Sequence, residues 1–244
     1  MKNIINKIRQ VYPVSDEALQ ALQADMQVRY YPKNTYIVHS GVTDRLVYFI
    51  EEGVARSVFH HNGQDTTTWF SQEGDITFGM DSLYYKQPSV ESIEALSDCK
   101  IYVIHIDKLN LLYETYIDIA NWGRILHQNV NKELSHMFVE RLQLSPKERY
   151  EQFNRHYPGL INRVKLKYVA AFLGISIYTL SRVRAQNKFS PVFFAFEQKN
   201  FRWQAVSLPS ENINLILRNK CLIPPQQHFR IPRRITIFWT DFVV

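Results

Sequence analysis

The chain has 244 residues, of which 45% are hydrophobic and 21% charged, enough for two modest domains of a globular protein; no stretch approaches the ~20 apolar residues of a membrane span. No apolar signal segment follows the basic first ten residues, so we expect a cytoplasmic location. The net charge is +6, and the two cysteines, Cys99 and Cys221, are too few for an iron–sulfur cluster or a cysteine-only zinc site and indicate no disulfide framework.

The first half of the chain is predicted to be helical over residues 4–29 and β-rich after that. Ser15 precedes two acids and an apolar repeat, as a helix N-cap does. Asn62-Gly63 suits the two positive-φ positions of a type I′ hairpin turn. Short β-type runs separated by turns lie at 35–39, 46–50, 54–59, 66–70, 76–78, 92–96 and 100–105. Such regular spacing indicates a closed antiparallel sandwich or β-roll, which we assign to a first domain of residues 1–116.

A long helix is predicted over residues 117–143. At 1.5 Å per residue it is about 39 Å long, more than one small domain covers. Its apolar stripe is therefore expected to pack against a second copy of the chain in a homodimer, although a helix buried in the chain's own core is the alternative. The stripe recurs every three or four positions and consists of Ile119, Trp122, Leu126, Val130, Leu134 and Met137.

Residues 144–189 have the pattern of a helix-turn-helix. Ser145, Pro146 and Glu148 form a capping-box start for a first helix, which ends before Pro158-Gly159. Further on, Ala170 is the small residue where two helices cross, and Gly174 follows where the turn needs positive φ. The residues expected to lock the two helices together are Val169, Leu173, Ile175, Leu180 and Val183. A plain helical hairpin in a core is the alternative.

The charge distribution favours nucleic-acid binding by this segment. Residues 1–140 have 12 Lys and Arg against 18 Asp and Glu, a net −6, whereas residues 141–189 have 10 against 2, a net +8. A basic module behind an acidic domain is typical of nucleic-acid-binding proteins, although a solvated surface gives the same balance.

The second helix of the motif would place its N-terminal half in the major groove of DNA. Arg182 is the candidate for bidentate contact with guanine, and Tyr178 for contact with bases or phosphate. Outward residues expected at the bases also include Ile177 and Ser181, while Ser176 caps the helix. The candidates for phosphate contact are Lys165, Lys167, Thr179 and Arg184.

The order of β-roll, long helix and helix-turn-helix resembles the Crp/Fnr family of bacterial transcription regulators. The residues that carry the resemblance are Leu144-Ser145, Glu148-Arg149-Tyr150, Leu173-Gly174-Ile175 and Thr179-Leu180-Ser181-Arg182, and it covers roughly residues 1–188. It implies a homodimer on near-palindromic double-stranded DNA, an effector-sensing roll and contact with RNA polymerase.

Two departures from the family's pattern concern the effector. Cyclic-nucleotide-binding members have Phe-Gly-Glu and then an Arg that neutralises the phosphate, but here Phe78-Gly79 precedes Met80 and Ser89 stands in place of the Arg. Burying a phosphate without a cationic or amide partner is costly, so we predict no cyclic AMP binding of the family's usual kind. An effector pocket for another small molecule, or for none, is expected around Phe78, Gly79, Met80, Asp81, Ser82, Ser89, Val90 and Glu91.

Residues 190–244, with a net charge of +4, match nothing in the family. The runs at 192–196 and 235–239 are strand-like in composition, whereas five prolines and scattered aromatic residues give no helical period. Three interpretations stand: an added β-hairpin, a binding arm, or non-native sequence appended near Lys188.

Other function classes have less support. A cupin-type metal site needs two histidines two positions apart on a strand, but His60 and His61 are adjacent and point to opposite faces. No nucleophile–base motif, phosphate loop or glycine-rich fingerprint occurs, so no catalytic residue, metal or cofactor is predicted. A roll that binds a ligand without reading DNA is the main alternative to an α+β transcription regulator.

Overall fold

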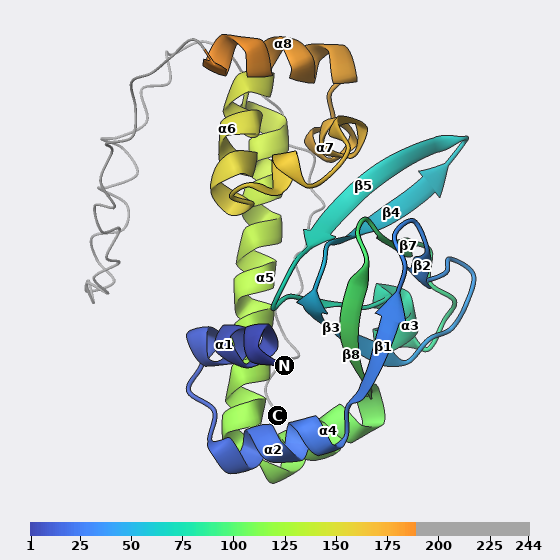
Figure 1. Cartoon of the computed structure of the whole chain (residues 1–244), viewed down its shortest axis with the longest axis vertical. Coiled ribbons are helices and arrows are strands. Elements are labelled where there is room, and N and C mark those ends of the chain that lie inside the picture. The colour runs from blue at the N-terminus through green and yellow to red at the C-terminus, as the bar shows by residue number, and fades with distance from the viewer. Residues whose placement is uncertain (189–244) are drawn as a thin grey trace, which may run out of the picture. The chain divides into compact units, whose positions relative to one another are not determined.

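A computed structural model of the chain describes residues 1–188, which form one compact unit of two antiparallel sheets and surrounding helices (Figure 1). The expectations for residues 190–244, and Cys221, lie outside the described residues. No helix of the described part is long and apolar enough to span a membrane.

The two sheets form the predicted antiparallel β-roll. One has the strand order β1 (Gln27–Tyr31), β8 (Cys99–His105), β3 (Leu46–Glu52) and β6 (Ile76–Thr77). The other has the order β2 (Tyr36–Val38), β7 (Ser92–Ala95), β4 (Ala55–His61) and β5 (Gln64–Ser71). Apolar side chains between the sheets, among them Tyr48, Ile50, Ile93 and Ile101, make the core of the roll.

The hairpin of β4 and β5 confirms the predicted turn. Asn62 and Gly63 have φ of 49° and 75°, as a type I′ turn requires, and His61 pairs with Gln64 on either side. Met80–Tyr85 forms α3, a short helix that the sequence pattern did not predict.

The helical structure expected over residues 4–29, with Ser15 as an N-cap, is confirmed up to Ala24 but is wrong for residues 27–29, which form a strand. The chain forms α1 (Lys2–Val11), α2 (Asp16–Ala24) and then β1. Pro13 cannot continue a helix, and Ser15 accepts a hydrogen bond from Ala18 N and so starts α2. The β-branched and aromatic residues after Met26 pair with β8 rather than extending the helix.

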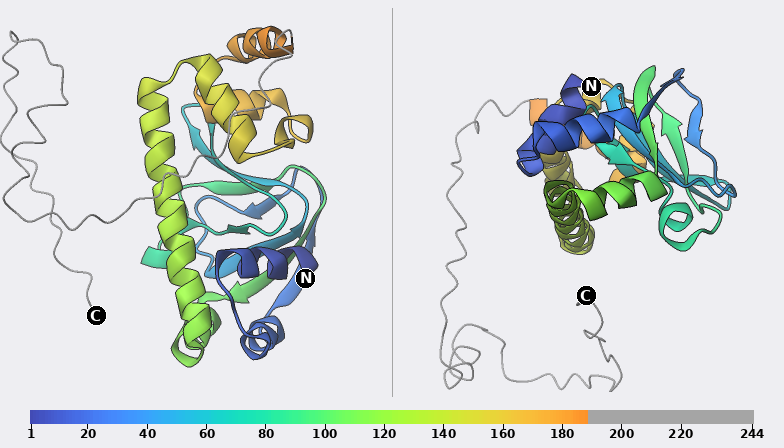
Figure 2. Two further views of the ribbon diagram at one scale, coloured as in Figure 1. Left: turned by 90° about the vertical axis from the view of Figure 1, so that its left-hand side faces the viewer. Right: turned by 90° about the horizontal axis from the view of Figure 1, so that it is seen from below.

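A second core joins the roll to the helices around it. α4 (Ile106–Thr115) and α5 (Ile117–Gln143) follow β8, and with α1 and α2 they bury Ile4, Leu22, Phe49 and Trp122. Both views of the chain show α5 running from the end of α4 past the roll to α6 (Figures 1 and 2).

The last helices form a third core against the roll. α6 (Pro146–His156) starts with the predicted capping box, with Ser145 and Glu148 bonded reciprocally. The 3₁₀ turn η1 (Leu160–Asn162), α7 (Leu166–Leu173) and α8 (Ile177–Lys188) follow. Their apolar side chains pack together and onto Phe70 of β5 and Val54.

Candidate nucleic-acid interface and ligand pocket

The connection between α7 and α8 is fixed by backbone and side-chain hydrogen bonds. Gly174 ends α7 with φ of 64°, and Ile175 N donates to Ala170 O at 3.0 Å. Ser176 Oγ accepts from Thr179 N at 3.0 Å and so caps α8. Val169, Leu173, Leu180 and Val183 are buried between α6, α7 and α8, while Ile175 is partly buried. These contacts hold the two helices in one orientation.

Two arginines to which the sequence analysis assigned no structural role hold the C-terminal end of α7. Arg149 Nη1 donates to Leu173 O at 2.7 Å, and Arg141 Nη2 donates to Phe172 O at 2.8 Å. Helix C-termini carry unpaired carbonyls and partial negative charge, which cations stabilise. Part of the basic charge of residues 141–189 therefore serves the structure itself.

One face of α8 is left to solvent. Ile177 and Tyr178 are 52% and 75% exposed, and Ser176, Ser181 and Arg182 are exposed as well. Thr179 and Arg184, two of the expected phosphate contacts, are half-buried, and Thr179 Oγ1 lies 2.9 Å from Ser176 Oγ. The predicted outward residues thus lie together on an accessible surface.

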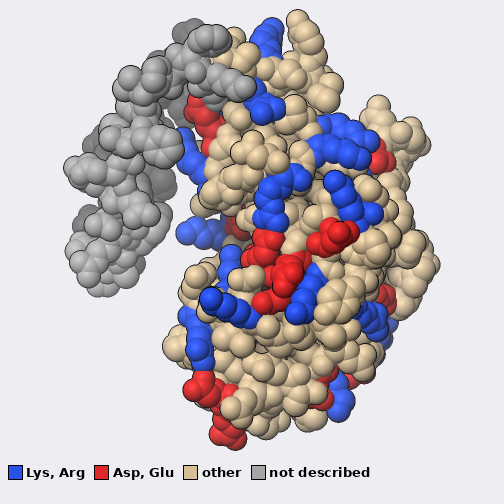
Figure 3. All heavy atoms as spheres, viewed as in Figure 1, with Lys and Arg blue, Asp and Glu red and all other residues tan. Residues whose placement is uncertain are grey.

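Lys165 and Lys167 are exposed at the start of α7, with their ammonium groups 5.8 and 5.1 Å from the ring centre of Tyr168. Lys and Arg side chains recur over the part of the molecule formed by α6, α7 and α8, and acidic side chains gather near the middle of the face in Figure 3. The exposed surface of α7 and α8 is therefore suited to a polyanion.

The helices α6–α8 are held on the roll through contacts that no sequence pattern predicted. Phe70 of β5 packs against Phe153, Tyr157 and Phe172, with ring centres 5.3–6.0 Å apart. The Arg163 guanidinium makes two hydrogen bonds to the Glu73 carboxylate, at 2.5 and 2.8 Å.

A buried arginine of the roll makes a further contact with these helices. Arg56, which is 3% exposed, donates to Glu94 and Thr67, and its guanidinium lies 3.8 Å from the ring centre of Tyr168 on α7. It therefore links an ion pair inside the roll to the helix that carries Lys165 and Lys167.

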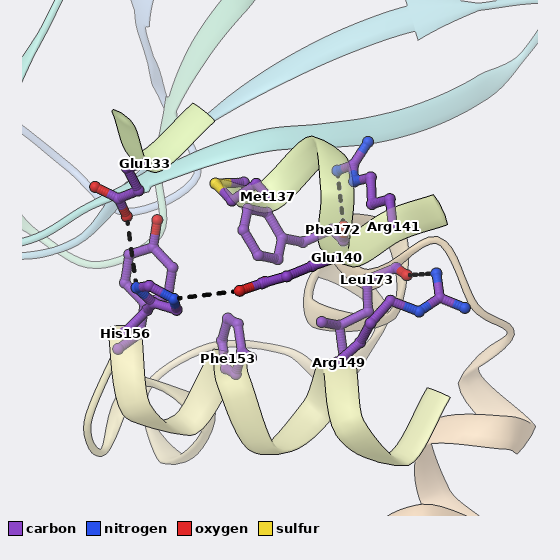
Figure 4. A pocket seen from close by; sticks show the side chains of 10 residues that line it. Glu133, Met137, Glu140, Arg141, Arg149, Phe153, His156, Phe172 and Leu173 are labelled. Carbon is purple, nitrogen blue, oxygen red and sulfur yellow. Dashed lines mark hydrogen bonds and ion pairs between the residues drawn. The ribbon is translucent and has the colours of Figure 1, made fainter. Parts of the chain in front are cut away.

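A small cavity of about 30 Å³ lies between α5, α6 and α7 (Figure 4). His156 of α6 lies 3.9 Å from each of two carboxylates on α5, Glu133 and Glu140, in the contacts drawn as dashed lines. Burial raises the pKa of Glu133. The cavity is too small for an organic ligand, and we assign it to packing between the helices.

A larger pocket of about 220 Å³ lies between the roll and α5. Of the predicted effector residues, Phe78, Met80 and Glu91 line it. The sequence analysis missed the other lining residues from the roll, Ser57, Thr68, Trp69, Ile76 and Thr77, and also His127 of α5. Residues 57, 69 and 77 face the pocket because of the pairing register of their strands, which a single sequence does not reveal.

The other predicted effector residues support the wall of this pocket instead of lining it. Ser82 is buried and hydrogen-bonded to the backbone of Asp44, and Ser89 Oγ donates to Glu91 O at 2.8 Å. A Cβ on Gly79 would lie 3.0 Å from Ser89 Oγ, so the two residues approach closely. Asp81 is half-buried and Val90 exposed, and Val90 N donates to Asp81 Oδ2 at 3.3 Å.

The predicted stripe of α5 faces mainly the chain's own roll. Ile119 and Trp122 are buried in the core with α1 and α4, and Met137 packs on the core of α6 and α7. Leu126, Val130 and Leu134 line the 220 Å³ pocket. The expectation that Ile119 and Trp122 face a second copy needs correction, because the chain's own core covers them, whereas Leu134 stays 43% exposed.

An apolar face near the end of α5, which shares Leu134 with the predicted stripe, is left uncovered in the described chain. Phe138 and Leu142 are 65% and 69% exposed, and Leu134 and Val139 are exposed beside them. They lie at three- and four-residue spacings near the end of the helix, so they form one patch, called here the α5 patch.

Histidines of the roll form no metal site within the described residues, where no group of three or more His, Cys, Asp and Glu comes together. His60 Nδ1 instead lies 2.6 Å from Asp65 Oδ1 across the hairpin.

Comparisons with known proteins support the fold and the domain type. Residues 28–116 match the family described as the cyclic nucleotide-binding domain. No curated protein matches the chain in sequence.

Three solved structures share the fold at low sequence identity. FixK2 from Bradyrhizobium japonicum is 17% identical, with 67% of this chain and 84% of that chain covered, at a TM-score of 0.55. CLP, the c-di-GMP responsive global regulator of Xanthomonas campestris, is 15% identical, with 71% of this chain and 92% of that chain covered, at a TM-score of 0.55. A CooA mutant from Carboxydothermus hydrogenoformans is 15% identical, with 72% of this chain and 86% of that chain covered, at a TM-score of 0.57. Residues 28–116 are thus similar to the cyclic nucleotide-binding domain, and the chain shares its fold with these three proteins, in agreement with the resemblance seen in the sequence.

Proposed function

We propose that the chain is a sequence-specific DNA-binding transcription regulator of the Crp/Fnr type. The observation that carries the proposal is the exposed face of α8, with Ile177, Tyr178, Ser181 and Arg182 presented on a helix that is locked onto α7 through Gly174. Ile177 and Tyr178 lie on the exposed face of α8, outside the described packing, and suit contact with base edges and thymine methyl groups. The low identity to known regulators supports a different DNA sequence as target.

The exposed basic residues fit the same assignment. Lys165 and Lys167 stand at the start of α7, where they would contact phosphates and fix the register of α8 in the groove. Thr179 and Arg184, which are half-buried, would reach phosphates only at their exposed atoms.

The active form proposed here is a homodimer. The α5 patch, with Leu134, Phe138, Val139 and Leu142, is the surface that would meet its counterpart on a second copy. Association through these residues would place two α8 helices on one DNA molecule, about 34 Å apart if they read successive major grooves. Isolated large apolar residues are common on protein surfaces, whereas a contiguous patch on one helix favours an interface.

The 220 Å³ pocket gives the proposed regulator a place for an effector. Its walls come from both the roll and α5, so an occupant would contact both elements at once. None of the described residues that line it is Lys or Arg, which argues against a cyclic nucleotide bound through its phosphate.

The proposed reading of DNA is tested with Arg182→Ala in the full chain. On a DNA site selected by the unmodified protein, the loss of a bidentate guanine contact would cost about 1–3 kcal/mol per half-site and relax the preference at one base pair. Arg9→Ala on α1, which removes a surface arginine paired with Asp16, is the matched control and would leave binding unchanged.

Equal loss of affinity by Arg182→Ala on all sequences would mean that Arg182 contacts phosphate. A full chain that binds a small molecule but shows no preference among DNA sequences would instead favour a ligand-binding roll without DNA readout.

A further inference from the structure

The pocket between the roll and α5 has an unusual balance of side chains. Seven of the residues that line it are apolar: Trp69, Ile76, Phe78, Met80, Leu126, Val130 and Leu134. A neighbouring cavity of about 110 Å³ shares Ile76, Phe78, Leu126 and His127 as walls. Together their volumes reach only the lower end of the roughly 300–1,000 Å³ typical of ligand sites.

Glu91 is the one carboxylate among the described residues that line this pocket, and it has no ion pair there. Its Oε2 accepts a long hydrogen bond from Thr68 Oγ1 at 3.3 Å, and the backbone of Met80 also stabilises the carboxylate, so the groups that donate to it are neutral. The charged group that acts on it most is another acid, Asp81. Burial raises the pKa of Glu91, since it disfavours the carboxylate form in this apolar setting.

The groups across the pocket do not supply the missing positive charge. His127 faces it from α5, and burial lowers the pKa of this histidine, which favours the neutral imidazole. The remaining polar walls, Ser57, Thr68 and Thr77, are hydroxyls. Glu91 is half-buried, and a carboxylate partly removed from water is stabilised by a cation, so the pocket is complementary to a positive group and opposed to a negative one.

We propose that this pocket binds a small amphiphilic cation, an apolar body with one amine, whose ammonium pairs with Glu91 and whose body packs on Trp69, Phe78 and Val130. The regulatory consequence rests on the function proposed above, whereas binding itself does not. The occupant would add contacts to Leu126, Val130 and Leu134 of α5 and so stabilise one position of that helix against the roll.

Three eight-carbon probes that differ only in the charge of their head group test the proposal. Octylamine, 1-octanol and octanoate are titrated below their micellar concentrations into the full chain, without DNA, and cyclic AMP is included as a fourth probe. Binding is followed by the fluorescence of Trp69, with Trp69→Phe identifying its signal, and by the shift in melting temperature. We expect octylamine to bind at least ten-fold more tightly than octanol, octanoate more weakly still, and cyclic AMP not to bind.

Two variants locate the effect. Glu91→Gln should bring octylamine and octanol within about three-fold of one another while octanol binding is kept, and Val130→Trp, which fills the pocket, should abolish both. Glu17→Gln, at an exposed acid of α2, is the matched control and should leave the order unchanged.

Tighter binding of octanoate or cyclic AMP than of octylamine would overturn the proposal, as would an unchanged amine preference in Glu91→Gln or no binding of any probe. Because these titrations contain no DNA, their failure leaves the proposed DNA reading untouched. Failure of DNA binding would likewise leave the result for the pocket intact.

Discussion

The buried Arg56 offers the strongest test of how the roll is tied to α7. Its Nε donates to Glu94 Oε2 at 2.8 Å and its Nη1 to Thr67 Oγ1 at 3.1 Å, and Tyr168 covers its guanidinium. Both Arg56 and Glu94 are buried. The substitution Arg56→Met fills the same space but leaves the Glu94 carboxylate without a cation.

The expected cost follows from which partner is left behind. Removing one member of a buried ion pair typically costs about 3–5 kcal/mol, because the other charge stays buried and unpaired. Replacing both members with apolar residues removes that penalty. The double variant Arg56→Met/Glu94→Leu should therefore cost no more than about 2 kcal/mol, of which the unpaired Thr67 hydroxyl accounts for roughly 1 kcal/mol.

Tyr168→Leu isolates the contact between the roll and α7. It keeps the ion pair and loses the ring over the guanidinium, which contributes about 2 kcal/mol when desolvated. Because the contact joins the roll to α7, we expect this variant also to loosen α7 and α8, seen as faster amide exchange in those helices.

Urea unfolding at pH 7 and thermal melting measure these differences. For a chain of this size, each 1 kcal/mol lowers the melting temperature by roughly 2–4 °C, so Arg56→Met should lower it by about 6–20 °C. The reasoning is refuted if Arg56→Met costs under 1 kcal/mol, or if the double variant is at least as unstable as the single one.

Three further predictions concern other contacts. Phe138→Glu in the α5 patch should weaken self-association at least ten-fold by sedimentation, whereas Phe59→Glu, at an exposed Phe of β4, should not. Lys167→Ala should lower the slope of log affinity against log salt by about 1 on any DNA sequence; an unchanged slope would remove Lys167 from the phosphate contacts. Burial opposes ionisation of Glu73, but hydrogen bonds from Arg163 and the backbone outweigh it and lower its pKa. Their pair therefore stabilises the fold above the carboxyl's unfolded pKa, so Arg163→Met should cost up to about 1 kcal/mol at pH 7, and the difference should vanish as the pH falls from about 5 through the lowered pKa. A difference that persists at low pH would contradict this assignment.

Local signals in the sequence predicted the elements whose structure depends on a few neighbouring residues. The turn at Asn62-Gly63 and the capping box at Ser145 each depend on conformations or hydrogen bonds within a few positions, and the structure confirms both. The end of α7 at Gly174 likewise follows from the positive φ that glycine adopts without strain.

The sequence predicted less where a side chain's environment depends on which distant element packs against it. The periodicity of α5 revealed an apolar stripe but not its partner, and the stripe with Trp122 turned out to face the roll, while the exposed Phe138 was not predicted. The contacts of Phe70 with α6 and α7 join residues more than eighty positions apart, which no local pattern encodes.

The ligand pocket shows the same limit in a different form. Phe78, Met80 and Glu91 of the predicted segment line the pocket, because the resemblance to a family marks that loop. The other nine lining side chains come from strands and from α5, and their direction depends on register and on the docking of the helix. Most of the pocket wall is therefore a property of the tertiary structure.

Selection of binding sites from random double-stranded DNA by the full chain, at physiological salt, tests the central claim most directly. The account predicts a two-fold-symmetric sequence with half-sites about one helical turn apart, bound in a saturable and salt-sensitive way. Weak binding with no sequence preference, with and without a ligand in the pocket, would contradict it.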